Sequence, residues 1–197
     1  MPAPVLTTSR LVLRHWQDSD LPAFAALNAD PQVMRYFPAA LHRQASDALA
    51  ARIRHRLETT PFGLWAVQIA GVTDFAGFIG LSVPSFDAPF MPCVEIGWRL
   101  ARPYWKMGYA TEGARAALGY AFDALHLPQV VAFTAAINSP SISVMQRLGM
   151  HHHAGDDFEH PALAEGHPLR QHVLYRIKPS IADNPLEINR HDRLRTH

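Results

Sequence analysis

The segment from Trp105 to Glu112 has the residue types of a site for a phosphate or a pyrophosphate. It follows a strand-like segment that ends at Leu100, and it opens a long amphipathic helix. The first N–H groups of a helix have no partners within the helix, and the helix dipole adds partial positive charge at the same end. Gly108 and Ala110 would let a ligand approach the backbone closely. We therefore expect a phosphate-bearing ligand at this turn.

Two common nucleotide-binding motifs do not fit the turn. A Walker A loop needs Lys and then Ser or Thr after its second glycine, but Ala114 and Arg115 follow Gly113. A dinucleotide fingerprint needs Gly-x-Gly-x-x-Gly and an acid at the end of the next strand, whereas position 110 is alanine and the apolar run 130–137 contains no acid. The simpler alternative is a turn whose glycine only closes the bend.

A second polar cluster follows the apolar run that ends at Ile137. Asn138 can cap a helix, and Gly149 can end it in a left-handed conformation. Within that helix, Asn138, Ser141 and Met145 share one face by their i, i+3, i+7 spacing.

The two motifs together resemble the GNAT superfamily of acyl-CoA-dependent N-acetyltransferases. They read Trp-x-x-Gly-Tyr-Ala-Thr-Glu from Trp105 and Asn-x-x-Ser-x-x-x-Met-x-x-x-Gly-Met from Asn138. The opening segment 6–14 and Glu-Ile-Gly-Trp at 95–98 are similar to the RimJ/RimL-like branch, whose founding members acetylate ribosomal-protein N-termini. The resemblance covers residues 5–178. Two departures are Lys106, where the branch usually has glycine, and Met145, where many relatives have a catalytic tyrosine.

This resemblance implies an α+β fold with a mixed, mostly antiparallel sheet, flanking helices and one parallel pair of strands that splays apart around pantetheine. It also implies acetyl-CoA as co-substrate and no metal. The expected cofactor-binding residues lie at the end of the first parallel strand, at the turn and on the second helix: Trp98, Arg99, Leu100, Met107, Gly108, Tyr109, Ala110, Thr111, Asn138, Ser141 and Met145.

Acetyl transfer to an amine needs a base and a stabilised oxyanion. Glu95 is the candidate base, because it lies within a strand beside the expected thioester and Gly97 leaves space on the same side. Pairing with a neighbour such as Arg99 is the structural alternative. His172, on an apolar final strand, is the rival base, although a lone histidine there is more often structural. Backbone N–H groups around 98–100 are expected to stabilise the oxyanion.

The leaving thiolate also needs a proton or a hydrogen bond. Ser141 is the candidate donor, but a serine at this helix position can simply bond to its own turn. Met145 cannot donate. Asn138 is expected to bind the pantetheine arm, to cap the helix, or both. By analogy with the family, Tyr36 and Phe37 are expected to wall the acceptor pocket.

Acidic and histidine-rich segments near the C-terminal end carry weaker predictions. Four acids could attract a cationic amine or could simply form a solvated loop: Asp156, Asp157, Glu159 and Glu165. The run His151-His152-His153 lacks a spaced partner set, which argues against a metal site.

Composition sets the remaining expectations. A chain of 197 residues fits one domain, here 5–178, with a flexible tail over 179–197. A net charge of +1 argues against a nucleic-acid surface. No signal peptide or membrane span is recognisable, and the single Cys93, read as a buried residue of a central strand, suits the cytoplasm. The expected partner is a small amine or a peptide or protein N-terminus, and the chain is expected to be a monomer or a homodimer.

The hydrophobic periodicity predicts the elements that position these residues. The predicted strands are 11–16, 64–70, 77–83, 93–100, 130–137, 151–158 and 170–177, the last two as an antiparallel pair. The predicted helices start at Asp18, at Arg43 (to Glu58), at the phosphate turn (to Leu125) and at Asn138. A helix between two strands of one sheet makes them parallel, so strands 93–100 and 130–137 should lie side by side with both C-terminal ends at one edge.

Three functions fit the predicted fold and motifs. The leading one is an N-acetyltransferase that uses direct attack in a ternary complex. The main alternative is a catalytically idle acyl-CoA-binding or sensor domain, which the missing tyrosine suggests. The third is transfer onto a hydroxyl group or transfer of a longer acyl chain.

Overall fold

A computed structural model describes residues 2–179, so all but the first residue of the predicted tail lies outside the described part of the chain. One mixed sheet runs in the order β1-β2-β3-β4-β5-β6-β9-β7, and β8 pairs with β9. The strands are β1 (Leu6–Thr7), β2 (Leu11–Arg14), β3 (Leu64–Ile69), β4 (Thr73–Ser82), β5 (Glu95–Leu100), β6 (Val130–Ala135), β7 (His151–His152), β8 (Phe158–Glu159) and β9 (Gln171–Ile177). This is the predicted α+β class.

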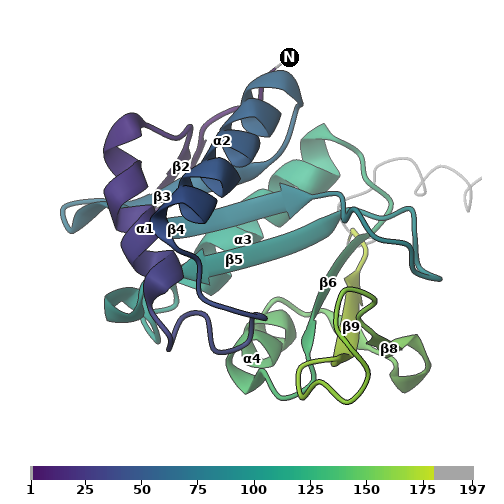
Figure 1. Ribbon diagram of the computed structural model, residues 1–197. Coiled ribbons are helices and arrows are strands. Elements are labelled where there is room, and N and C mark those ends of the chain that lie inside the picture. The colour runs from purple at the N-terminus through teal and green to yellow at the C-terminus, as the bar shows by residue number, and fades with distance from the viewer. Residues whose placement is uncertain (1, 180–197) are drawn as a thin grey trace, which may run out of the picture.

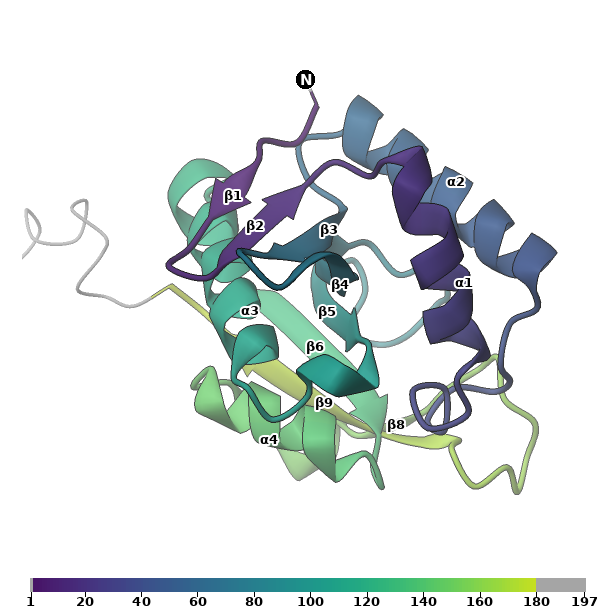
Figure 2. The same cartoon turned by 90° about the vertical axis from the view of Figure 1, so that its left-hand side faces the viewer.

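Four α-helices cover the sheet: α1 (Leu21–Ala29), α2 (Arg43–Thr59), α3 (Tyr109–Gly119) and α4 (Ser139–Arg147). Figure 1 shows α1 and α2 crossing one face of the sheet, and Figure 2 shows the sheet lying between these two helices and α3. Short 3-10 turns occupy Asp18–Asp20, Arg102–Tyr104 and Ala154–Asp156, and a π-helical segment, Tyr120–Ala124, extends α3. No helix within residues 2–179 combines the length and apolarity needed to cross a membrane.

The central feature of the sheet is the parallel pair formed by β5 and β6. Their only register pair is Glu95 with Val131, where the Val131 N–H donates to the Val94 carbonyl at 2.9 Å. Beyond this point the strands diverge, which Figure 1 shows as β5 and β6 running apart from a shared start. The predicted parallel arrangement and the splay are therefore both present.

The structure corrects several predicted boundaries. The predicted strand 151–158 is interrupted, because the 3-10 turn Ala154–Asp156 separates β7 from β8. Strand β4 begins at Thr73 rather than at position 77, since Gly71, with φ +70°, turns the chain tightly out of β3. Cys93 is half-buried and precedes β5, so it is not a buried residue of a central strand.

Candidate active site

The turn before α3 is built around two residues in left-handed backbone conformations. Gly108 is the N-cap of α3 with φ +82°, and Lys106 has φ +61°. The N–H groups from Gly108 to Thr111 donate no hydrogen bond to any residue of the described chain, and the first bond of the helix runs from the Glu112 N–H to the Gly108 carbonyl. A run of unpaired N–H groups at a helix start attracts anions. The geometry therefore fits the phosphate-binding turn that the sequence predicts.

The N-terminal hairpin holds this turn in place. The Arg10 Nε donates to Glu112 Oε2 at 2.7 Å, and the Thr8 hydroxyl donates to Glu112 Oε1 at 2.6 Å. Arg10 Nη1 also donates to the Met107 carbonyl at 3.0 Å, and its guanidinium lies 4.6 Å from the centre of the Tyr109 ring. Burial alone would raise the pKa of Glu112, but the bonds from Thr8 and Arg10 hold it below its ordinary value. Sequence reasoning missed this clamp, although Arg10 and Glu112 both lie in the motifs quoted above.

Replacement of Lys106 by glycine tests the backbone of the turn. A non-glycine residue with φ near +60° costs about 1–2 kcal/mol, and glycine removes that cost. Glycine also gives the unfolded chain more freedom, which offsets part of the gain. Lys106→Gly should therefore raise the free energy of unfolding by 0 to about 1 kcal/mol. Urea unfolding measures the change. Lys106→Ala keeps the strain and removes the same charge, so it should gain nothing, and a stability gain in both variants would contradict the backbone explanation.

Backbone groups of β5 face the gap where the two strands diverge. The Ala101 N–H bonds toward β4, to the Ala76 carbonyl, and the Val94 carbonyl bonds toward β6. Because the backbone groups of an antiparallel strand face its two neighbours alternately, the N–H and carbonyl of Trp98 face β6, beyond the last pair between β5 and β6. The carbonyl of Leu100 accepts the Trp105 indole N–H at 2.6 Å. The backbone of Trp98 is thus available to a ligand in the gap.

The start of α4 carries a closed hydrogen-bond network. The side chain of Asn138 accepts the Ser141 N–H at 3.4 Å, and its amide donates to Thr134 Oγ1 at 2.8 Å and to Ser141 Oγ at 3.1 Å. Asn138 therefore caps α4, which is one of its two predicted roles. Because the Ser141 oxygen accepts from Asn138, its own hydrogen is free to be donated outward. Met145 is 2% exposed in the core, so only its backbone could meet a ligand.

Glu95 lies at the point where β5 and β6 separate. Its side chain is half-buried, and Ser82 Oγ donates to its Oε2 at 3.3 Å. Burial raises the pKa of Glu95 to about 8, and the Ser82 bond offsets part of that rise. A Cβ placed on Gly97 would meet no atom within 4 Å, so the sheet is open beside Glu95 on the same face. A carboxyl group with this pKa next to open space can act as a base once it is deprotonated, which happens as the pH rises toward 8.

His172 lies in a different environment, within a cluster of aromatic rings. It is 9% exposed, and its Nδ1 lies 3.1 Å from the Arg170 carbonyl. Its ring centre is 4.9 Å from that of His160 and 5.5 Å from that of Phe158, and Phe86 of the loop before β5 packs against the same cluster. Burial lowers the pKa of His172. On β9, His172 pairs with Ala135 of β6, whereas Glu95 of β5 pairs with Val131, four residues earlier on β6. The two candidate bases are therefore well separated and do not form one hydrogen-bonded set.

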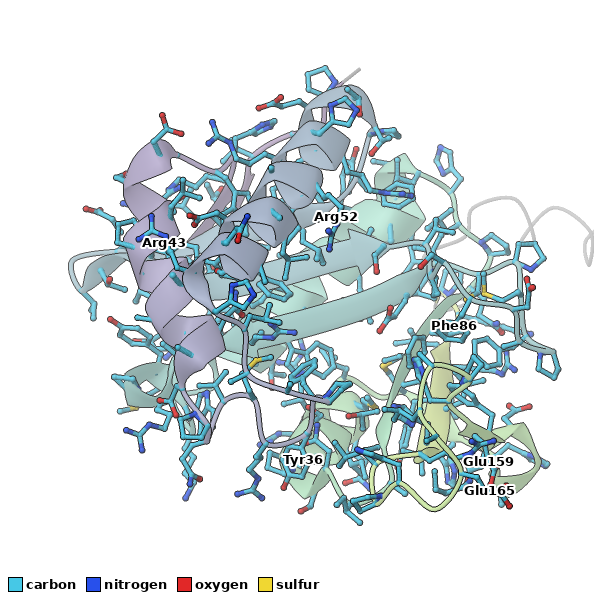
Figure 3. The ribbon with its side chains drawn as sticks, in the orientation of Figure 1. Tyr36, Arg43, Arg52, Phe86, Glu159 and Glu165 are labelled. Carbon is cyan, nitrogen blue, oxygen red and sulfur yellow. The ribbon has the colours of Figure 1, made fainter. Side chains whose placement is uncertain are left out.

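The segment between α1 and α2 crosses from β5 to the β6–β9 half of the sheet. Phe37 lies over the Arg99 guanidinium, 3.9 Å from it, whereas Tyr36 packs beside Ala135 and Leu163. Figure 3 shows Tyr36 below β5 and Phe86 over the β6–β9 side of the gap. The two aromatic residues predicted to wall the acceptor pocket thus lie apart, Phe37 beside β5 and Tyr36 beside the end of β6.

Three of the four acidic residues near the C-terminal end pair with basic side chains, which weakens their attraction for a cationic amine. Asp156 binds Arg176 at 2.8 Å, and Glu159 binds Arg170 at 2.9 Å. Asp157 lies 2.7 Å from His152. Figure 3 places Glu159 and Glu165 at the outer edge of the β8–β9 region, away from β5. Within residues 2–179, no three His, Cys, Asp or Glu side chains converge as metal ligands would.

Comparison with known proteins agrees with this geometry. A family model described as an acetyltransferase (GNAT) domain matches residues 10–151. The chain is 32% identical over 158 residues to FsC-acetyl coenzyme A-N(2)-transacetylase of Aspergillus fumigatus, covering 76% of this chain and 66% of that protein. It is 30% identical over 149 residues to the N-acetyltransferase YnaD of Bacillus subtilis, covering 74% and 81%. The fold resembles the crystal structure of a GNAT-family acetyltransferase from Bacillus anthracis, with a TM-score of 0.72, 23% identity, and coverage of 89% and 98%.

Proposed function

Because the chain belongs to the acetyltransferase (GNAT) family, we propose that it transfers the acetyl group of acetyl-CoA directly to a primary amine within a ternary complex. The observation that carries this proposal is the continuity of the site. The free backbone of Trp98 and the carboxyl group of Glu95 border the gap between β5 and β6, and the unpaired N–H groups lie in the turn that follows β5 and opens α3. We assign the chain to the RimJ/RimL-like branch on the motifs at 6–14 and 95–98.

The residues present fit acetyl-CoA as co-substrate. Its diphosphate fits the N–H groups from Gly108 to Thr111, where Gly108 presents no Cβ to a ligand. Pantetheine fits the gap between the diverging strands, where it can pair with the backbone of Trp98 as an added strand would. Arg10, which lies beside Gly108, adds positive charge near the diphosphate. The acetyl group would then lie near Gly97 and Glu95.

The reaction needs one proton to leave the amine and one to reach the thiolate. The amine nitrogen attacks the thioester carbonyl, a C–N bond forms, and the C–S bond breaks. Glu95 takes the proton from the nitrogen, directly or through water, and the Trp98 N–H stabilises the developing oxyanion. The Ser141 hydroxyl donates a hydrogen bond to the departing thiolate, at the position where many relatives use a tyrosine, and the thiolate takes its proton from solvent. The products are an N-acetylated amine and CoA.

Replacement of Ser141 by alanine should lower kcat by about tenfold to a hundredfold, because the thiolate then leaves without a hydrogen bond. The side-chain oxygen Oδ1 of Asn138 would still accept the backbone N–H of residue 141, so α4 should keep its cap. Acetyl-CoA affinity, measured by calorimetry, should change by less than about threefold. Ser143→Ala removes a hydroxyl from the same helix and serves as the control. An unchanged kcat in Ser141→Ala would leave this serine with a structural role only.

The experiment that tests the proposed function is a thiol-release screen with acetyl-CoA and a panel of amines and short peptides. Amine-dependent release of CoA, with mass spectrometry showing the acetylated amine, is the expected result. Binding of acetyl-CoA without release by any amine would favour the idle acyl-CoA-binding domain, the alternative suggested by Met145 in place of tyrosine. Release only with alcohols would favour transfer to a hydroxyl group.

A further inference from the structure

Arg99 is a charged residue of β5 to which the proposed mechanism gives no role. Side chains alternate along β5, so Glu95, Gly97 and Arg99 share the face that α1 and α2 cover. Opposite them on β4 stand Ser82, Gly80 and Phe78. Because a Cβ at Gly97 would meet open space, a ligand lying along this face could reach both Glu95 and Arg99.

The surroundings of Arg99 hold its guanidinium in one place. Its Nη1 donates to Asn28 Oδ1 at 2.7 Å, and the amide of the fully buried Asn28 is in turn bonded to the Ser46 hydroxyl at 2.9 Å. The guanidinium lies 3.9 Å from the centre of the Phe37 ring and 5.3 Å from that of Phe78. These contacts fix the group geometrically while leaving most of its five N–H donors unused.

Arg99 has no counter-ion within residues 2–179. None of the ion pairs formed there includes it, and its buried Nε has no hydrogen-bond partner. Arg14 shows the usual solution, since its two Nη atoms each bond to an Asp20 oxygen at 2.8 Å. Burial lowers the pKa of Arg99 to about 10, which still leaves it charged near neutral pH. A half-buried cation without a carboxylate partner is costly, and an anionic ligand would offset that cost.

We infer that Arg99 binds a carboxylate of the acetyl acceptor while the acceptor amine lies at Glu95. The inference rests on the proposed function and narrows its substrate class to molecules that carry both an amine and a carboxylate. A single fixed guanidinium matches the charge and planar shape of a carboxylate. A phosphate dianion would call for more positive charge than the one unpaired cation supplies.

The spacing along β5 sets the size of this acceptor. Four residues of strand separate the Cα atoms of Glu95 and Arg99 by about 13 Å. With one hydrogen bond at each end, the amine and the carboxylate would be separated by roughly 7–13 Å. That span exceeds a free α-amino acid and fits a peptide of two or three residues, or the first residues of a longer chain with an acidic side chain.

The charges of this face also discriminate against polyamines. Arg99 is cationic, and Glu95, with its pKa raised to about 8, is mostly uncharged at pH 7. The acids of the β8–β9 region that could attract a polycation are mostly paired with Arg170, Arg176 and His152. A purely cationic acceptor would therefore meet net repulsion.

A comparison of trialanine with its C-terminal carboxamide tests the inference in the thiol-release assay. We expect kcat/KM to be at least about tenfold higher for the free acid, and spermidine to be a poorer acceptor than either peptide. A second comparison distinguishes an acidic side chain from a C-terminal carboxylate as the group that binds Arg99. It uses a carboxamide-ended peptide with glutamate at its third position and the same peptide with glutamine there. Recovery with glutamate assigns the site to an acidic side chain, and no recovery assigns it to a C-terminal carboxylate.

The Arg99→Met variant should abolish the preference for the free acid, so that its ratio of kcat/KM for the acid to kcat/KM for the carboxamide falls to about one. Arg43→Met makes the same change on the exposed side of α2 and is the matched control. Equal kcat/KM for acid and carboxamide, a preference that survives in Arg99→Met, or spermidine as the best acceptor would overturn the inference. Failure to acetylate any amine would instead contradict the proposed function, and the inference with it.

Discussion

Glu95→Gln is expected to lower kcat/KM by about a hundredfold or more near pH 8 while making the folded protein more stable at the same pH. Glutamine keeps the shape of the side chain and can still accept the Ser82 hydrogen bond, but it cannot take a proton from the amine. The opposite signs of the two effects distinguish a catalytic base from a structural residue. A residue that merely supported the fold would lose stability together with activity.

The stability change follows from the raised pKa of Glu95. Its carboxyl group ionises near 4.5 in the unfolded chain and near 8 in the folded protein. Between these values the folded protein holds a proton that the unfolded chain has released, so stability falls as pH rises through this window. The upper limit of this loss is about 5 kcal/mol above pH 8. Glutamine does not ionise, so the variant should show a smaller fall in urea-unfolding free energy between pH 5 and about pH 8.

The rate should follow the same ionisation in the opposite direction. The base acts when deprotonated, so kcat/KM of the wild type should rise by about tenfold per pH unit up to about pH 8 and then level off. A weakly basic acceptor amine, already neutral across this range, assigns the rise to the enzyme. Ser82→Ala should move the inflection to higher pH, because the Ser82 bond lowers the pKa of Glu95. An inflection that persists in Glu95→Gln would assign the titration to another group.

The second large effect is expected at the turn before α3. Gly108→Asp places a carboxylate where the diphosphate should lie, so acetyl-CoA affinity should fall by at least about a hundredfold. The fold should survive, since aspartate tolerates the left-handed conformation at φ +82° better than most residues, and a Cβ at this position would meet only Arg10 Nη2, at 3.4 Å. Calorimetric titration with CoA measures the affinity, and circular dichroism checks the fold.

Gly108→Asn is the matched control for this variant. Asparagine has nearly the shape of aspartate, tolerates the left-handed conformation required by φ +82°, and carries no charge. It should therefore lose much less affinity than Gly108→Asp. Equal losses in the two variants would show that bulk or backbone strain, and not charge, is responsible. Unchanged affinity in both would locate the cofactor away from this turn.

The local features of the site could be predicted from the sequence because each depends on neighbouring residues. The turn at Gly108, the cap at Asn138 and the end of α4 near Gly149 follow from turn and capping preferences. The parallel pairing of β5 and β6 follows from the helix that connects them. Helix α2 was likewise predicted to within about one residue.

The features that depend on long-range register could not be predicted. Ser82 meets Glu95 only because β4 and β5 pair as they do, and Asn28 meets Arg99 across 71 residues of chain. The clamp between Arg10 and Glu112 joins segments 102 residues apart. The break between β7 and β8 was also missed, although Gly155 and Asp156 in the turn Ala154–Asp156 are residue types that favour turns.

A crystal structure of the protein with CoA bound is the most direct test of the central claim, which is that the gap between β5 and β6 is the acetyl-transfer site. The diphosphate is expected within hydrogen-bond distance of the N–H groups from Gly108 to Thr111. The thiol is expected between Trp98 and Ser141, on the side of the gap that Glu95 borders. CoA bound elsewhere, or with its thiol directed away from Glu95, would contradict the claim.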